Sequence, residues 1–333
     1  MNRLAHLCFG IICLFFLSVG LHAQTDAAIK AAKTTVTDAS GAFKPYQKFV
    51  DNDSAHWLFG GDGVLSFRAT SLANWSAGGE DQLGISPIVN LFLNYKKEKR
   101  TFENYLTLAY GFLKTGERKA LKSDDRFWYS AKLGHQISPK WFYTATVLAR
   151  TQFTPGYKYS NTDTIRISDF LAPAYVYVSA GLDYRPNNSF SLVFSPVMGK
   201  ATYVNSGDMT IMATAGMVTT EKDETGADVL VPHRSRHEFG GGALFSFKGN
   251  LFKNKVSYNS QVELFSNYVQ KPENVDVFWT FQTKVLLFKN ITGDFRLDLK
   301  YDDDQKSIRD DGSLGGAKTQ IKYFTGVGLF YQF

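Results

Sequence analysis

The end of the chain constrains its fold more than any other part, because every second residue there is apolar, aromatic or threonine. The alternating set is Ile321, Tyr323, Thr325, Val327, Leu329, Tyr331 and Phe333. Small or polar residues such as Lys322, Gly326 and Gly328 lie between them. A strand spans a bilayer when one face meets lipid and the other a polar interior, which requires a period of two. The pattern is typical of the last strand of a transmembrane β-barrel, although an edge strand of a soluble sandwich has the same period.

The connections between alternating segments separate these two alternatives. About twelve segments of this kind follow one another from residue 64 to the end of the chain. The expected long connections are 73–81, 114–125, 154–169, 199–235, 269–276 and 302–317, and the short ones lie near Glu98, Pro139, Asn187, Gly249 and Asn290. Only the turn at Gly249 is about as long as a neighbouring long connection. Long outer loops that alternate with short periplasmic turns, together with an even strand number, indicate an all-β, antiparallel outer-membrane β-barrel with a periplasmic C-terminus.

The N-terminal residues predict export from the cytoplasm. Arg3 precedes an apolar run from Leu7 to Leu21, and Ala23 ends an acceptable cleavage site, so residues 1–23 are expected to be a signal peptide. Both cysteines, Cys8 and Cys13, lie in this segment, and neither follows the small residue of a lipoprotein site. Residues 24–56 show no period and are expected to form a periplasmic arm, which leaves 57–333 for the barrel.

Composition agrees with a barrel and argues against a nucleic-acid partner. Aromatic residues make up 15% of the chain and hydrophobic residues 44%, yet no apolar run after Leu21 is long enough for a membrane helix. Alternating strands dilute hydrophobicity in this way. The formal net charge is only +6, and no basic block is present.

The inward faces of the predicted strands carry charges of both signs. They are Arg68, Lys132, Arg150, Asp183, Glu263, Lys284, Arg296, Asp298 and Lys300. Lys132 and Arg150 lie on neighbouring faces, and Asp183 and Glu263 supply the opposite charge. Mixed charges favour an ion-paired, mostly closed interior, whereas a polar path for a small solute is the alternative.

Few residues suggest catalysis or metal binding. His233 and His237 lie in or beside a long outer loop together with arginines and Glu238, and this cluster is either a solvated rim or a site for an anion or a metal. The acidic stretch 302–311 lacks the spacing of an EF-hand, so a solvated loop is favoured over a calcium site. We therefore expect no catalytic residues, no metal site and no cofactor.

One local pattern goes beyond alternation. Asn74 and Trp75 precede the paired glycines Gly78 and Gly79 in the first outer loop, which suggests a turn that only glycine tolerates. This Asn-Trp-x-x-Gly-Gly-Glu stretch resembles the hallmark of a Bacteroidota outer-membrane family catalogued as domain of unknown function 3078. The resemblance continues through Arg150-Thr151-Gln152-Phe153-Thr154-Pro155-Gly156-Tyr157 and later motifs that extend to the end of the chain.

The resemblance implies a fold but no activity. It carries over only structural roles: Asn74, Trp75, Gly78 and Gly79 would fix the outer loop, and Gln152 with Arg150 would brace the lumen, with Gly156 and Tyr157 in the same motif. Tyr331 and Phe333 resemble the terminal signal that barrel-assembly machinery reads. We expect a structural or accessory component of the cell envelope or of a larger outer-membrane complex, in contact with outer-membrane lipid. A channel or transporter for a small or amphipathic solute is the alternative.

Overall fold

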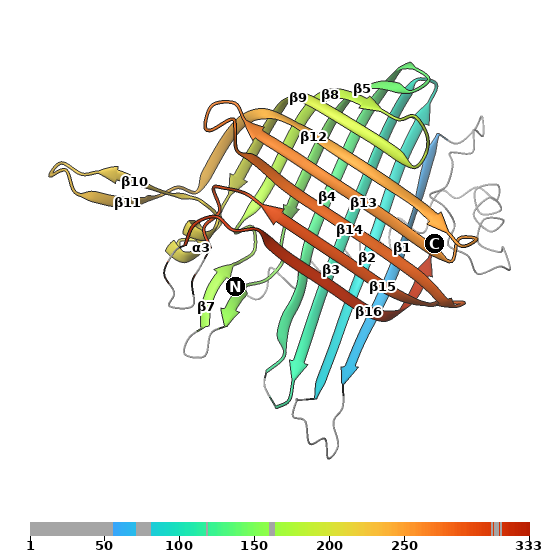
Figure 1. Ribbon diagram of the computed structural model, residues 1–333, viewed down its shortest axis with the longest axis horizontal. Coiled ribbons are helices and arrows are strands. Elements are labelled where there is room, and N and C mark those ends of the chain that lie inside the picture. The colour runs from blue at the N-terminus through green and yellow to red at the C-terminus, as the bar shows by residue number, and fades with distance from the viewer. Residues whose placement is uncertain are drawn as a thin grey trace, which may run out of the picture. The chain divides into compact units, whose positions relative to one another are not determined.

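The computed structural model describes residues 56–70, 81–117, 119–159, 164–307, 309, 313 and 315–333. Twelve strands form a closed antiparallel barrel in which each strand pairs with its neighbours and β1 pairs with β16. They are β1 (Trp57–Thr70), β2 (Gln82–Lys97), β3 (Arg100–Thr115), β4 (Leu121–Ser138), β5 (Trp141–Thr151), β8 (Ala174–Tyr184), β9 (Phe190–Tyr203), β12 (Ser235–Leu251), β13 (Val256–Asn267), β14 (Val275–Phe288), β15 (Ile291–Tyr301) and β16 (Gln320–Gln332). The predicted fold, an all-β outer-membrane barrel, is confirmed (Figure 1).

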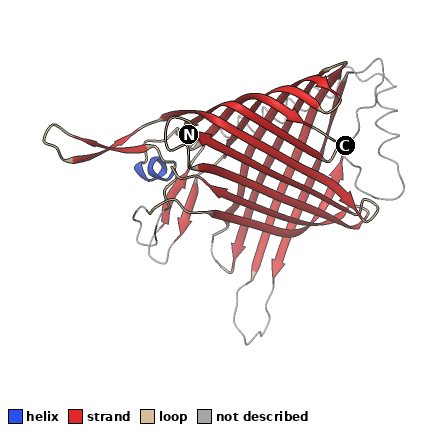
Figure 2. Cartoon of the chain, turned by 45° about the horizontal axis from the view of Figure 1, so that its top comes forward, coloured by secondary structure: helices blue, strands red, loops and turns tan. Residues whose placement is uncertain are grey.

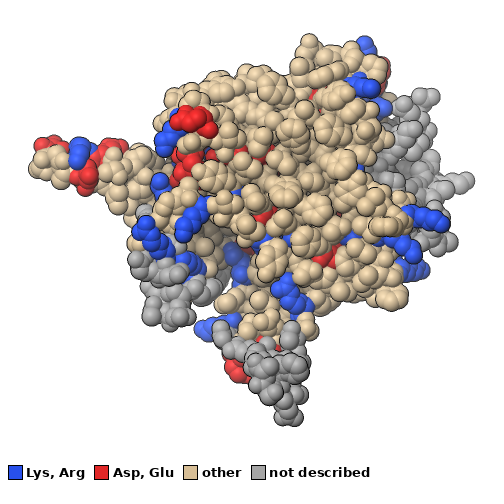
Figure 3. Space-filling view, viewed as in Figure 1, with Lys and Arg blue, Asp and Glu red and all other residues tan. Residues whose placement is uncertain are grey.

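The outer wall of the barrel is apolar, as the alternation predicts. In β16 the side chains of Ile321, Tyr323, Val327, Leu329 and Tyr331 are all exposed on the outside. Most of the wall in the space-filling view is uncharged, and charged side chains gather mainly at its ends (Figure 3). An apolar outer wall of this kind is typical of a barrel that spans a membrane.

The connections differ in length between the two ends of the barrel. We call one the long-loop end, which has the connections 71–81, 116–120, 152–173, 204–234, 268–274 and 302–319. The other is the short-turn end, with 98–99, 139–140, 185–189, 252–255 and 289–290. The connection expected at 114–125 shrinks to 116–120, because β3 and β4 both extend past their regular alternation.

Three further expectations about the strands need correction. The first strand begins at Trp57 rather than Val64, since Gly60, Gly61 and Gly63 hide its early alternation. The turn expected at Gly249 lies instead at 252–255, where three successive residues take positive φ of 51°, 56° and 64°. Gly249 itself pairs with Tyr258 inside the sheet.

The third correction concerns β9, where a bulge at Pro196 exchanges the two faces of the strand. The register of β9 shifts against β8 between Ala180 and Leu182, and against β12 between Gly240 and Gly242. Proline is tolerated at a bulge because it has no N–H for the ladder. Phe194 therefore faces outwards, whereas Met198, which regular alternation from Phe194 would also place outwards, is buried in the interior.

Gly181 makes this bulge possible. A Cβ at position 181 would collide with the carbonyl oxygen of Phe194, while a Cβ at Gly199, on the partner strand, would meet nothing within 4 Å. We expect Gly181→Ala to lower the free energy of unfolding by about 1–3 kcal/mol, as overpacking does. Gly199→Ala should leave stability unchanged. Heat-induced unfolding followed on semi-native gels measures both variants, and equal midpoints would contradict this role of Gly181.

The long loops contain their own small elements. They are β6 (Gly156–Tyr159) with β7 (Thr164–Ser168), α3 (Met209–Thr214), and β10 (Val218–Lys222) with β11 (Asp228–Pro232). The β10–β11 hairpin extends away from the barrel strands (Figure 2). Asp208 caps α3 by accepting hydrogen bonds from the backbone N–H groups of Thr210 and Ile211.

Apolar residues hold this loop together. Ile211, Met212 and Met217 pack with Ala172 and Val204 in a small buried cluster. The loop after β9 is therefore packed against the loop before β8. No helix among the described residues has the length and hydropathy needed to cross a membrane.

The predictions for the N-terminal part stay predictions. The signal peptide 1–23 and almost all of the arm 24–56 lie outside the described residues, as do Asn74, Trp75, Gly78 and Gly79.

Candidate functional site

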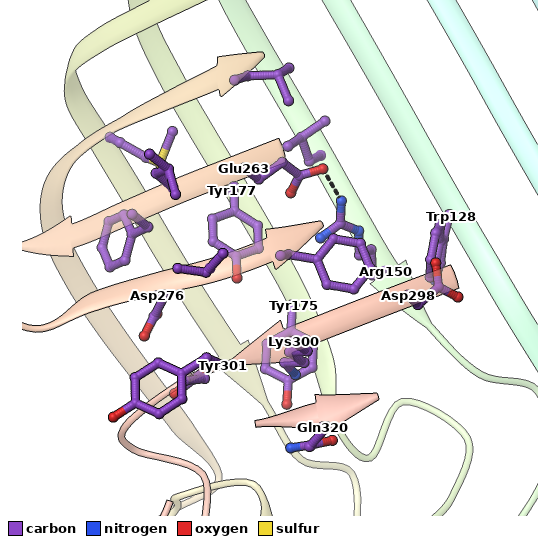
Figure 4. A pocket seen from close by; sticks show the side chains of 18 of the residues that line it. Trp128, Arg150, Tyr175, Tyr177, Glu263, Asp276, Asp298, Lys300, Tyr301 and Gln320 are labelled. Atoms are coloured by element: carbon purple, nitrogen blue, oxygen red, sulfur yellow. Dashed lines mark hydrogen bonds and ion pairs between the residues drawn. The ribbon is translucent and has the colours of Figure 1, made fainter. Parts of the chain in front are cut away.

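Oppositely charged side chains meet across the barrel interior. Arg150 on β5 forms an ion pair and hydrogen bond with Glu263 on β13 (Figure 4). Three strands, β8, β9 and β12, separate β5 from β13 around the wall, so this pair crosses the lumen. The Arg150 guanidinium also lies 4.3 Å from the ring centroid of Phe278 and 5.2 Å from that of Trp128. Arg150 is therefore held by one carboxylate and two aromatic faces.

Two more arginines lie close to the ring of Trp128. The guanidinium carbons of Arg296 and Arg126 lie 4.8 and 5.4 Å from its ring centroid. The indole also contacts the Phe278 ring edge-on, at 5.5 Å, although β4 and β14 lie on different parts of the wall. Cation–π contacts of this kind gain strength where water is excluded. Aromatic and guanidinium groups thus cluster in the middle of the barrel.

Lys200 on β9 is the most buried cation of the interior, with a fully buried side chain. Its Nζ lies 2.6 Å from Asp276 and 3.2 Å from Asp302, and 3.5 Å from Glu238. These carboxylates come from β14, from the loop after β15 and from β12. One ammonium group therefore ties together four segments at the long-loop end.

Loop residues extend this network towards the long-loop end. Burial alone would raise the pKa of the Asp302 carboxyl, but the nearby Lys200 and Lys300 ammonium groups outweigh burial and hold that pKa below its ordinary value. Gln305 donates hydrogen bonds to Asp302 at 3.1 Å and to the Tyr175 hydroxyl at 2.7 Å. The 302–319 loop is in this way fastened to the barrel interior.

Two more pairs link strands that are not neighbours. Lys284 lies 2.6 Å from Asp62, and Lys322 lies 2.8 Å from Asp124. They join β14 to β1 and β16 to β4, each across intervening strands.

A separate cluster of ion pairs lies at the short-turn end. Lys132 lies 3.0 Å from Asp183 and 3.5 Å from Glu103. Arg185, in the turn after β8, contacts the same two carboxylates at 2.6 and 2.5 Å. Burial lowers the pKa of the Arg185 guanidinium, but Glu103 and Asp183 outweigh it and raise the pKa overall. Lys132 and Arg185 therefore share the two carboxylates Glu103 and Asp183 at this end.

A cavity of about 410 Å³ remains between the mid-barrel pairs and the long loops. Figure 4 shows Tyr175, Tyr177 and Lys300 within it, with the Arg150–Glu263 pair on one side. Aliphatic side chains cover another part of its wall. They are Leu148, Val193, Met198 and Leu244.

The described residues of the sequence motif lie partly at the cavity and partly in the loop after β5. Arg150 and Gln152 both line the cavity, and Gln152 also donates a hydrogen bond to the backbone carbonyl of Asp169, in the following loop. Gly156 and Tyr157 belong to the short strand β6. Gln152 thus connects the cavity wall to a loop, and the expectation that it braces the lumen together with Arg150 stays a prediction.

The loop candidates for anion or metal binding separate as well. His233 hydrogen-bonds Thr219 at 2.8 Å, and His237 is exposed. Arg236 pairs instead with Glu238 at 3.1 Å and with Asp304 at 3.0 Å. Within the described ranges, no group of three or more His, Cys, Asp or Glu residues is placed to hold a metal ion.

Sequence reasoning missed several partners of the network. The sequence pattern places Lys200 in a loop, because the bulge at Pro196 exchanges the faces of β9 and interrupts the alternation. The proline inside an apolar strand is the signal that could have predicted this bulge. Asp62 was missed because glycines obscure the start of β1. Glu103 lies on the inward face of β3 and could have been recognised from the parity of that strand.

The closed sheet, apolar wall and polar interior define this protein as an outer-membrane β-barrel. Residues 67–157 match the family described as "Protein of unknown function (DUF3078)", which confirms the resemblance over this part of the chain. No match among curated proteins reaches significance.

Solved barrels resemble the chain only distantly. The translocator domain of autotransporter NalP from Neisseria meningitidis is 10% identical, with 91% of this chain and 95% of that chain covered and a TM-score of 0.33. The NanC porin is 9% identical, with 82% and 99% covered and a TM-score of 0.31. The Ralstonia pickettii toluene transporter TbuX is 11% identical, with 83% and 88% covered and a TM-score of 0.26. Such similarity implies nothing about ligands or activity.

Proposed function

We propose that this protein is a closed outer-membrane barrel that serves as a structural or accessory component of the cell envelope. The observation that carries the proposal is the set of ion pairs that line and cross the lumen. Arg150–Glu263 crosses its middle, Lys200 joins three carboxylates at the long-loop end, and Lys132–Asp183 lies at the short-turn end. A path for water and ions would need these paired groups to separate at every level.

The pairing of opposite charges along the lumen supports a closed barrel. Lumenal pairs rigidify a wall when both partners are satisfied, and breaking one leaves an uncompensated charge in a poorly solvated interior. A pore that selects and conducts ions is lined by charges of one sign. These pairs instead place both signs on the lumenal wall. The proposal assigns no catalytic activity and no cofactor.

The orientation and partners belong to the same proposal. The long-loop end would face the outside and the short-turn end the periplasm, which is the arrangement of bacterial barrels. Outer-membrane lipid would cover the apolar wall, barrel-assembly machinery would insert the chain, and a further envelope protein would bind the loops.

Purification from native outer membranes tests the accessory role. Extraction in a mild detergent should recover the barrel with a partner protein in a fixed ratio, measured by native mass spectrometry. Recovery of the barrel alone, across several detergents and after cross-linking, would contradict an accessory role.

A channel or transporter for a small or amphipathic solute is the second candidate. The cavity near Tyr175 and Lys300 favours it, because a solute path needs internal space. Conductance of the purified barrel distinguishes the two candidates.

A further inference from the structure

We propose that the cavity at the long-loop end binds a small amphipathic carboxylate, with its anionic group at Lys300 and its apolar body against the aliphatic wall. This goes beyond the closed-barrel function, which needs no ligand.

Lys300 differs from the other cations around this cavity. Arg126, Arg150 and Lys322 each have a carboxylate within ion-pair distance. Within the part of the chain that the structure describes, the Lys300 ammonium has neither an ion-pair nor a hydrogen-bond partner, and its contact is the ring of Tyr175, 4.5 Å from Nζ to the centroid. Asp276 and Asp302, which lie near it, are already engaged by Lys200. The ammonium is therefore available to an incoming anion.

Tyr177 offers a second polar contact. Its hydroxyl also has no hydrogen-bond partner among the described residues, and its ring meets that of Phe265 edge-on at 6.3 Å. Tyr177 and Lys300 both line the same cavity (Figure 4). A carboxylate could accept hydrogen bonds from both groups, and charge-assisted bonds of this kind are among the stronger ones.

The remaining wall fits an apolar body. Leu148, Val193, Met198 and Leu244 come from β5, β9 and β12, on a different part of the wall from Lys300 on β15. A ligand with one charged end and one apolar end would therefore contact both parts. The volume of about 410 Å³ lies towards the small end of ligand pockets, which favours a small molecule over a lipid.

Equilibrium dialysis of the purified full-length barrel in detergent tests this, with benzoate as the probe. Benzoate joins a carboxylate to a compact apolar ring, and benzamide is its neutral analogue of similar shape. We expect saturable binding of benzoate at one site, above a protein-free micelle blank, and at least tenfold weaker binding of benzamide. Absence of saturable binding, or equal binding of the two probes, would overturn the proposal.

Variants locate the site. Lys300→Met should weaken benzoate binding at least tenfold, whereas Lys248→Met, on β12 towards the short-turn end and outside the cavity wall, should leave it unchanged. Leu148→Phe should weaken binding by filling the apolar part while it preserves Lys300. If Lys300→Met does not fold, the comparison of Leu148→Phe with wild type still decides the matter. Unchanged binding in Leu148→Phe, or a loss in Lys248→Met equal to that in Lys300→Met, would contradict the assigned site. Neither result depends on whether the barrel conducts.

Discussion

Replacement of Lys200 by methionine should lower the free energy of unfolding of the barrel by about 3–5 kcal/mol. The variant removes the ammonium that Asp276, Asp302 and Glu238 share within 3.5 Å and leaves three carboxylates close together. Methionine has nearly the length of the lysine stem, so the loss is electrostatic rather than a loss of packing. The temperature at which the folded band disappears on a semi-native gel measures the effect.

Lys222→Met is the matched control. Lys222 pairs with Asp228 on the β10–β11 hairpin, where the two side chains are 66% and 64% exposed. Exposed pairs contribute little to stability, so this variant should unfold at the wild-type temperature. A Lys200 variant as stable as the control would show that the buried network does not hold the barrel together.

The second large effect is expected at Arg150. Arg150→Ala should destabilise the barrel by about 3 kcal/mol, because Glu263 loses its partner across the lumen. The contacts of the guanidinium with Trp128 and Phe278 are lost at the same time. The variant should also show small conductance steps that the wild type lacks, because the side chain that crosses the lumen is shortened.

A double variant separates the ion pair from the packing. Arg150→Met with Glu263→Gln removes both charges and keeps most of the volume, so it should recover much of the stability that Arg150→Ala loses. If the double variant is as unstable as the single one, the aromatic contacts rather than the ion pair hold Arg150. Thermal unfolding of the three proteins under one condition decides between these accounts.

The sequence is sufficient for those parts of the structure that depend on local periodicity. The outward face of β16 and the inward positions of Lys132, Arg150, Asp183 and Glu263 follow from the period of two within single strands. The family motif can also be recognised from the sequence, because its residues are contiguous. These features need no knowledge of how distant strands are placed.

Partners across the lumen could not be predicted in this way. Arg150 meets Glu263 only because of the stagger of strands that are four positions apart around the barrel, which no local pattern encodes. Lys200 reaches the lumen through a bulge that depends on Gly181 and Pro196 together. Its carboxylate partners come from three other segments, so the centre of the network became visible only in the closed barrel.

Single-channel recording of the wild-type barrel in a planar bilayer tests the closed lumen most directly. The crossing pairs predict a quiet membrane at moderate voltage, with occasional small events at most. Frequent, large and stable conductance steps from the purified wild-type protein, with an Arg150 variant that alters only their ion selectivity, would contradict a closed barrel and identify a channel.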